Sequence, residues 1–277
     1  MGMRIQTNIA AINAQRNLVG SQRIMNDSMA KLASGSRINK AADDAAGLAI
    51  SETMKGQIRS AAMAQRNAND GISMIQTAEG GLNEISNIII RLRELGIQAG
   101  SDTIGEKERG MLNKEVVQLR DEIQRIAKTT NWGTTKLLDG SAPAFDFQVG
   151  INNDPKNDRI TFEAGRGAAT LDALGLDGLS YDTKEGAQNA LSRLDDAQLA
   201  VNGTRAYMGA LQNRLTSAAD NLGVMQENLS AANSRIRDTD IAAASSEMTR
   251  NSILLQAGTS VLSQANQSSQ LALKLIG

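Results

Sequence analysis

"ALSRLDDAQLAVNGTRAYMGALQNRLTSAADNLGVMQENLSAANSRI" (residues 190–236) repeats its apolar positions every seven residues without a break. Two rows of residues, offset by four positions, carry this repeat. The first row is Leu194, Val201, Met208, Leu215, Leu222, Leu229 and Ile236, and the second is Ala190, Ala197, Thr204, Leu211, Ala218, Met225 and Ala232. Paired rows of this kind predict one long helix with a coiled-coil seam. The many small residues of the second row would let a partner helix approach closely.

Two earlier stretches carry seams of the same kind. One runs through Met54, Ile58, Ala61, Ala68, Ile72, Ile75 and Leu82, and a shorter one runs through Leu112, Val116, Leu119, Ile123 and Ile126. Between them, the stretch AGSDTIGEKERG (99–110) has the glycines and serine of a helix-to-helix turn. Three amphipathic helices can bury their apolar stripes against one another, so we expect a rod-like bundle.

The middle of the chain has a different composition. Five of the six aromatic residues and both prolines fall between residues 132 and 181. The stretches FDFQV (145–149) and RITFE (159–163) alternate apolar and polar residues around the turn-rich GINNDPKND (150–158). This pattern predicts a β-hairpin. We interpret the block as a small β cap at the point where the helical chain reverses direction.

The two ends of the chain each lack a single apolar face. One N-terminal stripe is Ile5, Ile9, Ile12 and Val19, and a shifted one is Leu18, Met25, Met29 and Leu32. At the C-terminal end, Ile241, Met248, Leu255, Leu262, Leu273 and Ile276 hold a seven-based frame, while Leu254, Val261 and Leu275 lie on another face. A helix that is apolar on several sides needs several partners, within the chain or from neighbouring copies. An ordinary buried terminal helix is the alternative.

These patterns together predict a mainly α fold. We expect a long antiparallel helical rod, or coiled-coil bundle, with a small β-hairpin region at one end. The expected domains are an inner terminal-helix domain (1–40 and 236–277), a helical rod domain (41–130 and 187–235) and a β-rich cap of the rod (131–186).

Composition narrows the chemistry that the chain can perform. The sequence contains no Cys and no His, which removes thiol nucleophiles, disulfides, the usual zinc sites and the imidazole of general acid–base catalysis. The formal net charge of −1 argues against a general polyanion binder, and no aromatic residue interleaves with the basic residues of 1–42 for base stacking. No apolar run approaches the roughly 18 residues of a membrane span. We therefore expect no catalytic site, cofactor or metal, no nucleic-acid partner and no membrane insertion.

Two adjacent carboxylates, Asp43 and Asp44, stand out in SGSRINKAADDAAGLAISE (34–52). Paired acids can hold a metal, but neighbouring helical residues point about 100° apart and would not converge on one ion. Carboxylates are also favoured at a helix start, where they accept free backbone N–H groups. We interpret the pair as the start of a helix, with Asn39 as its N-cap.

At this point the stretches taken together resemble bacterial flagellin, the subunit of the flagellar filament. The resemblance rests on LASGSRINKAADDAAGLAISE, RNANDGISMIQTAEGGLNEI and RLRELGIQAG, in that order, and on LQNRLTSAADNL and SRIRDTDIAAASSEMTRNSILLQAGTSVLSQANQ near the other end. It covers roughly residues 1–140 and 187–277. Only about 50 residues occupy the region where flagellins carry variable outer domains, so the chain resembles a short form that lacks them.

The resemblance implies a structural subunit that self-assembles into a helical filament for swimming motility. Flagellin terminal helices are disordered in the free monomer and become coiled coils when subunits stack, which would make Ile5, Ile9, Ile12, Val19, Met248, Leu255, Leu262 and Leu273 assembly residues. The implied partners are many copies of the chain, the flagellar cap and hook-junction proteins, an export chaperone and the type III export apparatus. The implied location is the extracellular filament, reached without a cleaved signal peptide.

The resemblance also implies a site read by the flagellin-sensing Toll-like receptor of animals. Arg91, Leu95 and Glu115 match positions of that motif, while Leu119 stands where many recognised flagellins have Arg. Two rival functions remain open: a hook–filament junction protein, which shares the terminal helices, and a soluble coiled-coil adaptor. An enzyme is the weakest hypothesis.

Overall fold

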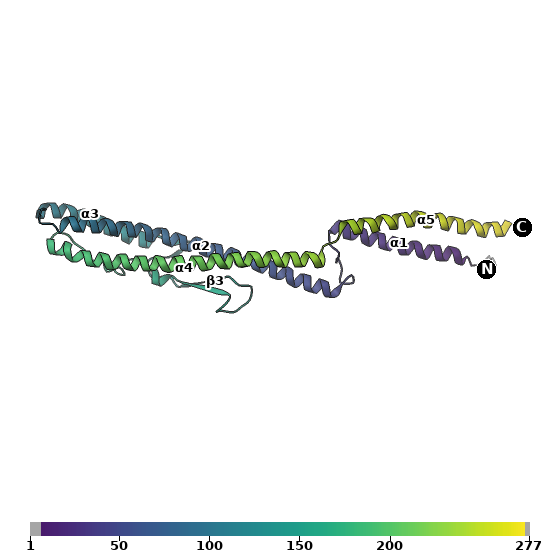
Figure 1. Cartoon of the computed structure of the whole chain (residues 1–277), viewed down its shortest axis with the longest axis horizontal. Helices are drawn as coiled ribbons and strands as arrows, with labels where there is room; N and C mark the ends of the chain where they lie inside the picture. The colour runs from purple at the N-terminus through teal and green to yellow at the C-terminus, as the bar shows by residue number, and fades with distance from the viewer. Residues whose placement is uncertain (1–6, 275–277) are drawn as a thin grey trace. The chain divides into compact units, whose positions relative to one another are not determined.

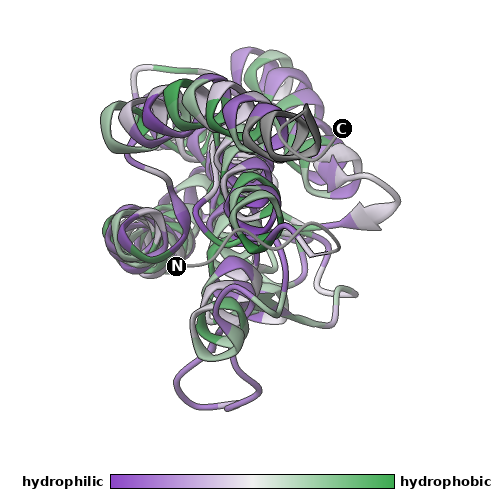
Figure 2. Ribbon diagram, turned by 90° about the vertical axis from the view of Figure 1, so that its right-hand side faces the viewer, coloured by the Kyte–Doolittle hydropathy of each residue, from purple (hydrophilic) through white to green (hydrophobic). Residues whose placement is uncertain are grey.

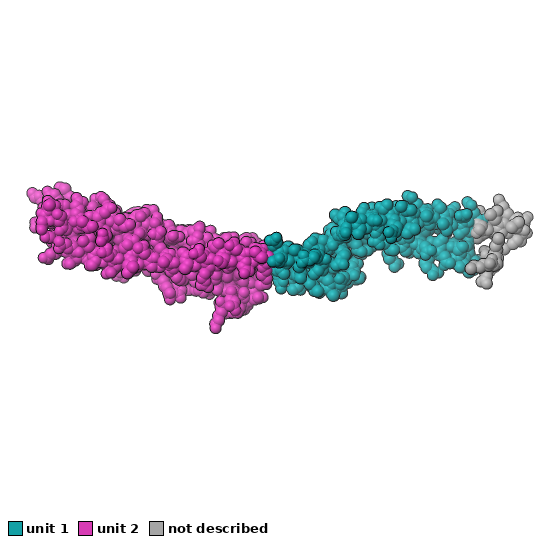
Figure 3. All heavy atoms as spheres, viewed as in Figure 1, with its two compact units in different colours: residues 1–57, 227–277 teal, residues 58–226 magenta. Residues whose placement is uncertain are grey.

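The structure of the chain is a computed structural model that describes the backbone of residues 7–274 and the side chains of residues 7–267. The chain divides into two compact units (Figure 3): unit 1 is residues 1–57 and 227–277, and unit 2 is residues 58–226. The predicted mainly α fold is confirmed, because the described elements are five long helices, one short 3-10 helix and two small antiparallel sheets. The predicted domain boundaries stay predictions.

The elements follow one another as Figure 1 labels them. The helices are α1 (Ile9–Ser34), α2 (Ala45–Ala99), α3 (Glu106–Thr129), α4 (Lys184–Arg237) and α5 (Ile241–Lys274). The strands are β1 (Asn131–Trp132), β2 (Thr135–Lys136), β3 (Ala144–Gln148) and β4 (Arg159–Glu163), and a 3-10 helix, η1, covers Ala164–Gly167. Hydrophobic and hydrophilic residues alternate along the helical ribbons (Figure 2), as in helices that bury only part of their circumference.

The three predicted seams form the core of unit 2. Ten residues of α4 are buried. Two of them, Ala187 and Ala219, lie outside the two predicted rows, and the other eight are members of those rows: Ala190, Leu194, Ala197, Val201, Met208, Leu211, Leu215 and Leu222. On α2 and α3 the seam residues Ala68, Ile75, Leu82, Val116 and Ile123 are buried in the same core. The predicted helices and their buried faces are therefore confirmed.

The turn between α2 and α3 is closed by an arginine that the sequence analysis did not single out. Arg109 is buried, and its guanidinium donates Nε–H to the carbonyl of Ala99 (2.8 Å) and Nη2–H to the carbonyl of Ser101 (2.8 Å). The last carbonyls of a helix have no partner within the helix. Arg109 supplies a donor to one of them, at Ala99, and its charge suits the negative end of the α2 dipole.

The predicted β-hairpin is confirmed: β3 pairs antiparallel with β4, with Phe145 opposite Phe162 and Phe147 opposite Ile160. The hairpin lies on the flank of α2, where Asn67 Nδ2 donates to the carbonyl of Gln148 (3.1 Å). Its two strands lie between α3 and α4 in the chain, and the predicted β-rich cap of the rod stays a prediction. The hairpin docks on the flank because apolar side chains of β3 and β4 belong to the core shared with the helices.

Tyr181 joins the segment before α4 to α2. Its side chain is fully buried, and its hydroxyl donates to the carbonyl of Leu92 (2.8 Å). Burial raises the pKa of Tyr181 to about 12, because the charged phenolate would be poorly solvated there. The hydroxyl therefore stays a neutral donor at physiological pH.

We expect Tyr181→Phe to lower the free energy of unfolding by about 1 kcal/mol, because it removes this buried hydrogen bond and retains the ring. Urea unfolding followed by circular dichroism measures the change. Tyr207→Phe is the matched control, since Tyr207 is only half-buried and its hydroxyl accepts a long hydrogen bond from the Glu163 N–H (3.5 Å). Equal effects of the two substitutions would contradict the assigned role of Tyr181.

Candidate interaction surface

Within unit 1, α1 and α5 run antiparallel, side by side (Figure 1). Asn8 begins α1 by accepting the Ala11 N–H with its side-chain oxygen (3.1 Å), and its Nδ2 donates to the carbonyl of Ala265 (2.9 Å). At the other end Gly35 ends α1 with a φ of 68°, a left-handed conformation suited to glycine. Its carbonyl accepts the Thr239 N–H (3.0 Å).

One face of each helix is covered in this pair. The buried and half-buried residues of α1 include Ala11, Ala14, Leu18, Ser21, Met25, Ser28 and Leu32, and those of α5 include Ala244, Met248, Asn251, Leu255, Gly258, Leu262 and Ala265. Both rows alternate spacings of three and four residues, which is the pattern of a coiled-coil seam. We call these two rows the inner seam.

The predicted assembly residues of α5 fall on the inner seam. Met248, Leu255 and Leu262 are half-buried there. The side chain of Leu273 lies outside the described residues. The exposed apolar residues of α5 include Ile253, Leu254 and Val261.

The predicted assembly residues of α1 face the other way. Ile9, Ile12 and Val19 are 55%, 49% and 56% exposed, and Ile5 lies outside the described residues. We call the exposed large apolar residues of both helices the outer face: Ile9, Ile12, Val19, Ile24 and Met29 of α1, and Ile241, Ile253, Leu254 and Val261 of α5.

The shifted α1 stripe predicted from the sequence supplies Leu18, Met25 and Leu32 to the inner seam, whereas its fourth member, Met29, is exposed. The small residues of the same row were not predicted as part of a seam, although they have the correct spacing. The reason is its composition, because Ala, Ser and Met occupy most positions and the large β-branched residues lie on the outer face. Two polar side chains are buried in the seam, Ser28 and Asn251. A close contact is also built into it: a Cβ on Gly258 would lie 2.8 Å from Leu18 Cδ2.

The segments that connect α1 to α2 and α4 to α5 are paired with each other, and we call this pairing the joint. Arg37 N–H donates to the carbonyl of Arg237 (2.6 Å), and Ser36 forms an antiparallel bridge with Asp238. Arg37 Nη2 also donates to the carbonyl of Ile236 (2.7 Å). These bonds tie together two segments that lie about 200 residues apart in the sequence.

Side chains of α2 and α4 reinforce the joint. Arg237 Nη1 lies 2.5 Å from Glu52 Oε1, and the fully buried Ser51 donates Oγ–H to Asn233 Oδ1 (2.7 Å). The hydrogen bond from Arg237 is the main reason why the pKa of Glu52 lies below its ordinary value, with the charge of Lys55 adding to it.

The paired acids do mark the start of α2, but the predicted N-cap, Asn39, is wrong. Asp44 lies directly before the helix and accepts the Gly47 N–H with Oδ1 (2.9 Å). Asp43 Oδ2 accepts the N–H groups of Lys40 (2.9 Å) and Asn39 (3.0 Å), which lowers the pKa of Asp43. The helix begins later than predicted because the residues from 39 to 43 form a turn around the Asp43 carboxylate.

The residues of the receptor motif are only partly accessible. Arg91 Nη2 pairs with Glu115 Oε1 (2.9 Å) and Arg91 Nη1 with Glu94 Oε2 (3.0 Å), all on the surface. Leu95 is 1% exposed and belongs to the core of unit 2. The structure therefore brings Arg91 and Glu115 together on the surface, and it buries Leu95 in the core, where a binding protein would not contact it.

Within the described residues, no group of three or more acidic side chains could hold a metal ion. Among the described helices, none is long and apolar enough to cross a membrane.

Comparison with known proteins agrees with this architecture. Residues 5–142 match the bacterial flagellin N-terminal helical region, and residues 191–276 match the bacterial flagellin C-terminal helical region. A flagellin of Halalkalibacterium halodurans is 44% identical over 274 residues, covering 99% of this chain and all of that protein. A flagellin of Bacillus subtilis is 40% identical, also over 99% of this chain and all of that protein.

Solved structures include related folds. The crystal structure of Bacillus cereus flagellin matches with a TM-score of 0.51 and 32% identity, over 57% of this chain and 88% of that chain. A putative flagellar hook-associated protein from Vibrio parahaemolyticus matches with a TM-score of 0.58 over 71% of this chain and all of that one, at 12% identity. The second match shows a shared fold alone.

The paired terminal helices and the helical core of unit 2 define a structural protein with an uncovered apolar face at its ends. The two family matches and the full-length relatives are more specific: the chain belongs to the bacterial flagellin family.

We expect Gly258→Ala to weaken the pairing of α1 with α5 by about 1–3 kcal/mol, because the added methyl group would overlap Leu18. Amide hydrogen exchange of residues 9–34 in assembled protein measures the pairing. Gly20→Ala in α1 is the matched control, since nothing lies within 4 Å of its added Cβ. Faster exchange in both variants would contradict the contact at Gly258.

The joint should lose stability in acid. Because the pKa values of Glu52 and Asp43 are lowered in the folded chain, their contribution is complete above their unfolded pKa values and is lost as the pH falls through the lowered ones. We expect Glu52→Gln to flatten the dependence of the urea midpoint on pH below about 4.5, whereas Glu84→Gln, an exposed carboxylate outside the joint, leaves it unchanged. A flat profile in the unsubstituted chain would contradict this role.

Proposed function

We propose that this chain, as a structural subunit of the bacterial flagellar filament, polymerises by burying the outer face of α1 and α5 against neighbouring copies. The observation that supports this most directly is the exposure of Ile9, Ile12 and Val19 in a helix that is already paired on its other side. The full-length relatives are flagellins and a flagellar filament core protein, the latter from Brachyspira hyodysenteriae.

The physical argument rests on what an exposed β-branched residue can gain. Complete burial of a Val or Ile side chain stabilises a protein or a complex by about 1.5–3 kcal/mol. Because Ile9, Ile12 and Val19 are about half exposed, roughly half of that free energy is still available to each of them when another copy covers it. Each copy in a polymer meets several neighbours, so modest gains per contact add along the filament. A helix with two apolar faces then has an inner partner within the chain and an outer partner from another copy.

The remaining partners follow from the same role. We propose that the chain is exported through the flagellar type III apparatus with the help of a chaperone, without a cleaved signal peptide, and is added beneath the flagellar cap above the hook-junction proteins. The absence of cysteine from the sequence supports unfolded passage, since no disulfide has to be broken. Flagellin homologues form the filament, which is extracellular, and we propose a purely structural role without catalysis there.

Recognition by the animal Toll-like receptor stays a proposal. The exposed pair of Arg91 and Glu115 supports a surface contact. Leu95 is buried, and we propose that it holds α2 in place beneath that pair. The rival functions, a hook–filament junction protein and a coiled-coil adaptor, are not favoured by any relative at high identity. A hook–filament junction protein would be present in few copies in purified filaments, whereas a filament subunit would be abundant. A coiled-coil adaptor would form a small closed oligomer in solution instead of an open polymer.

We expect the double substitution Ile12→Ser and Val19→Ser to abolish filament formation, because it removes apolar area from the outer face without touching the inner seam. Electron microscopy and sedimentation of the purified protein measure assembly. Met111→Ser is the control, since Met111 is an exposed apolar residue of α3 in unit 2.

The unfolding midpoint of unit 2 should stay unchanged in the double variant. Normal filaments from a folded double variant would rule out the outer face as the assembly surface. Loss of assembly in the Met111→Ser control alone would move that surface to unit 2.

A further inference from the structure

Polar contacts cross between α2 and α4 inside unit 2. Gln65 Nε2 donates to the carbonyl of Ala219 (3.2 Å), and Gln198 Nε2 donates to Ser86 Oγ (2.8 Å). Ser86 is buried. Gln65 reaches the α4 backbone because a glycine, Gly223, lies beside it: a Cβ there would be 3.3 Å from Gln65 Nε2. Polar groups in a helix contact add little stability, and their best-attested role is to fix helix register.

A third contact lies between these two. Arg205 Nη2 is 3.9 Å from Glu79 Oε1, and both side chains are about one-third exposed. We call the three contacts the rungs. Along α2 the rung residues are 14 and then 7 residues apart, and along α4 their partners have the same spacings in the opposite direction. Every rung therefore joins one row of α2 to one row of α4, as in an antiparallel helix pair with a seven-residue repeat.

The residues between the rungs show what the two rows contain. The α2 row is Ser51, Ile58, Gln65, Ile72, Glu79 and Ser86, and the α4 row is Asn233, Gln226, Ala219, Gln212, Arg205 and Gln198. Gln65 and Glu79 occupy the two positions at which the apolar seam of α2 is interrupted. Polar and apolar residues thus alternate unevenly along the α2 row, so the row does not repeat every seven residues.

The apolar rows of α4, by contrast, repeat every seven residues without a break. Sliding α4 along α2 by seven residues, or about 10 Å, would again place apolar residues against apolar residues. The rungs distinguish these alignments. Sliding in one direction places Ile72 opposite Arg205 and buries an unpaired guanidinium. Sliding in the other places Glu79 opposite Gln212, so the carboxylate loses its arginine.

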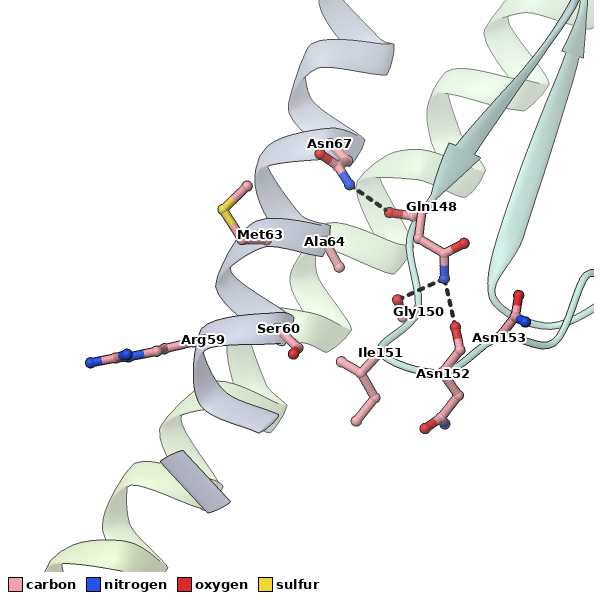
Figure 4. A pocket seen from close by; sticks show the side chains of 10 residues that line it. All are labelled: Arg59, Ser60, Met63, Ala64, Asn67, Gln148, Gly150, Ile151, Asn152 and Asn153. Carbon is pink, nitrogen blue, oxygen red and sulfur yellow. Dashed lines mark hydrogen bonds between the residues drawn. The ribbon is translucent and has the colours of Figure 1, made fainter. Parts of the chain in front are cut away.

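Polar residues of α2 outside this row have other surroundings (Figure 4). Asn67 points toward the β3–β4 hairpin and donates to the carbonyl of Gln148 (3.1 Å), whereas Arg59 points away from the hairpin. The rung residues are therefore distinguished by their place in the repeat and by their partners on α4, since polarity alone is common along α2.

In unit 1, a fourth contact continues the spacing. Ser51 donates Oγ–H to Asn233 Oδ1 (2.7 Å), and each residue lies 14 positions from the nearest rung on its own helix. The next residue of α2 is Glu52, which pairs with Arg237 in the joint. A slide of seven residues would carry Arg237 about 10 Å from Glu52. The register of α2 against α4 therefore decides whether the joint can form.

We propose that the rungs are a register lock, which selects one alignment of α2 against α4 from those that the apolar repeat permits. Glu79 and Arg205 select it by charge, and Gln65, Ser86 and Gln198 select it by hydrogen bonding. The lock acts within one folded chain, so the inference does not depend on the proposed filament role.

A distance between two spin labels on the full chain measures the register. Because the sequence has no cysteine, Glu84→Cys with Asp220→Cys introduces the only two thiols, both at exposed positions. The rung spacing places residue 84 beside residue 200, so the labels are separated by about 30 Å along the helix pair. Pulsed electron paramagnetic resonance should give one distance in this labelled chain.

The test variant adds Gln65→Ile, Glu79→Ile and Arg205→Gln to the labelled chain. These changes make the α2 row isoleucine from 58 to 79 and the α4 row glutamine from 198 to 212, so Ser86 can meet a glutamine in two alignments. We expect a second population whose separation along the helix pair is shorter by about 10 Å. The urea midpoint should stay equal or rise, because apolar side chains of similar volume replace polar ones.

The matched control makes the same three exchanges at exposed positions outside the two rows: Gln76→Ile, Glu108→Ile and Arg214→Gln. It should keep one distance. A single, unchanged distance in the test variant, or a second distance in the control, overturns the register lock. Loss of helicity in the test variant also overturns it, because the rungs would then be needed for stability.

Charge exchange at one rung provides a second measurement. Arg205→Glu places two carboxylates opposite each other and should produce the shorter distance. Adding Glu79→Arg restores an ion pair in the original alignment and should return the single longer distance. Persistence of the shorter distance after this exchange contradicts the lock, as does an unchanged distance in Arg205→Glu alone. Failure of the unsubstituted chain to polymerise would refute the proposed function and leave the register lock intact.

Discussion

Close approach of helices through small side chains is the constraint on which unit 2 depends. Ala68 of α2 and Ala190 and Ala197 of α4 are buried in the seam that joins these helices. Alanine permits a short distance between helix axes, and leucine and isoleucine side chains fill most of the remaining core, so few aromatic side chains are needed. The low aromatic content of the chain follows from this packing. The larger rings are used where strands leave more space, as between Phe145 and Phe162, which stack at 6.3 Å.

Small side chains also line the helix contact in unit 1, but there the result is different. The inner seam between α1 and α5 contains Gly258 and the buried polar residues Ser28 and Asn251, so the pair buries little apolar area by itself. The large β-branched residues Ile12 and Val19 lie on the outside. A helix pair with a modest inner contact and an apolar exterior gains stability chiefly when other copies cover it. This arrangement suits a subunit whose ends order as it polymerises.

Asp43 and Asp44, the paired acids that could have indicated a metal site, instead stabilise the start of α2 and the turn before it. Asp44 caps α2 and Asp43 organises the turn before it, while Glu52 binds the Arg237 guanidinium across the joint. The sequence predicted the helix start within a few residues because carboxylates are favoured at a helix N-terminus, where they accept free backbone N–H groups. It could not find the pairing of Ser36 with Asp238, because nothing local relates two segments so far apart in the chain.

The sequence by itself determined the helices of unit 2, their buried rows, the hairpin and the family, because each rests on local periodicity or on a contiguous motif. Only the tertiary structure decided which face of α1 is covered. The α1 row of the inner seam consists of two alanines, two serines, a methionine and two leucines, which is a weaker apolar pattern than a stripe of isoleucine and valine, yet this row is the one that packs against α5. The tertiary structure also brought the β3–β4 turn onto α2. That docking depends on contacts between residues about 80 positions apart, such as Asn67 and Gln148, which no local pattern records.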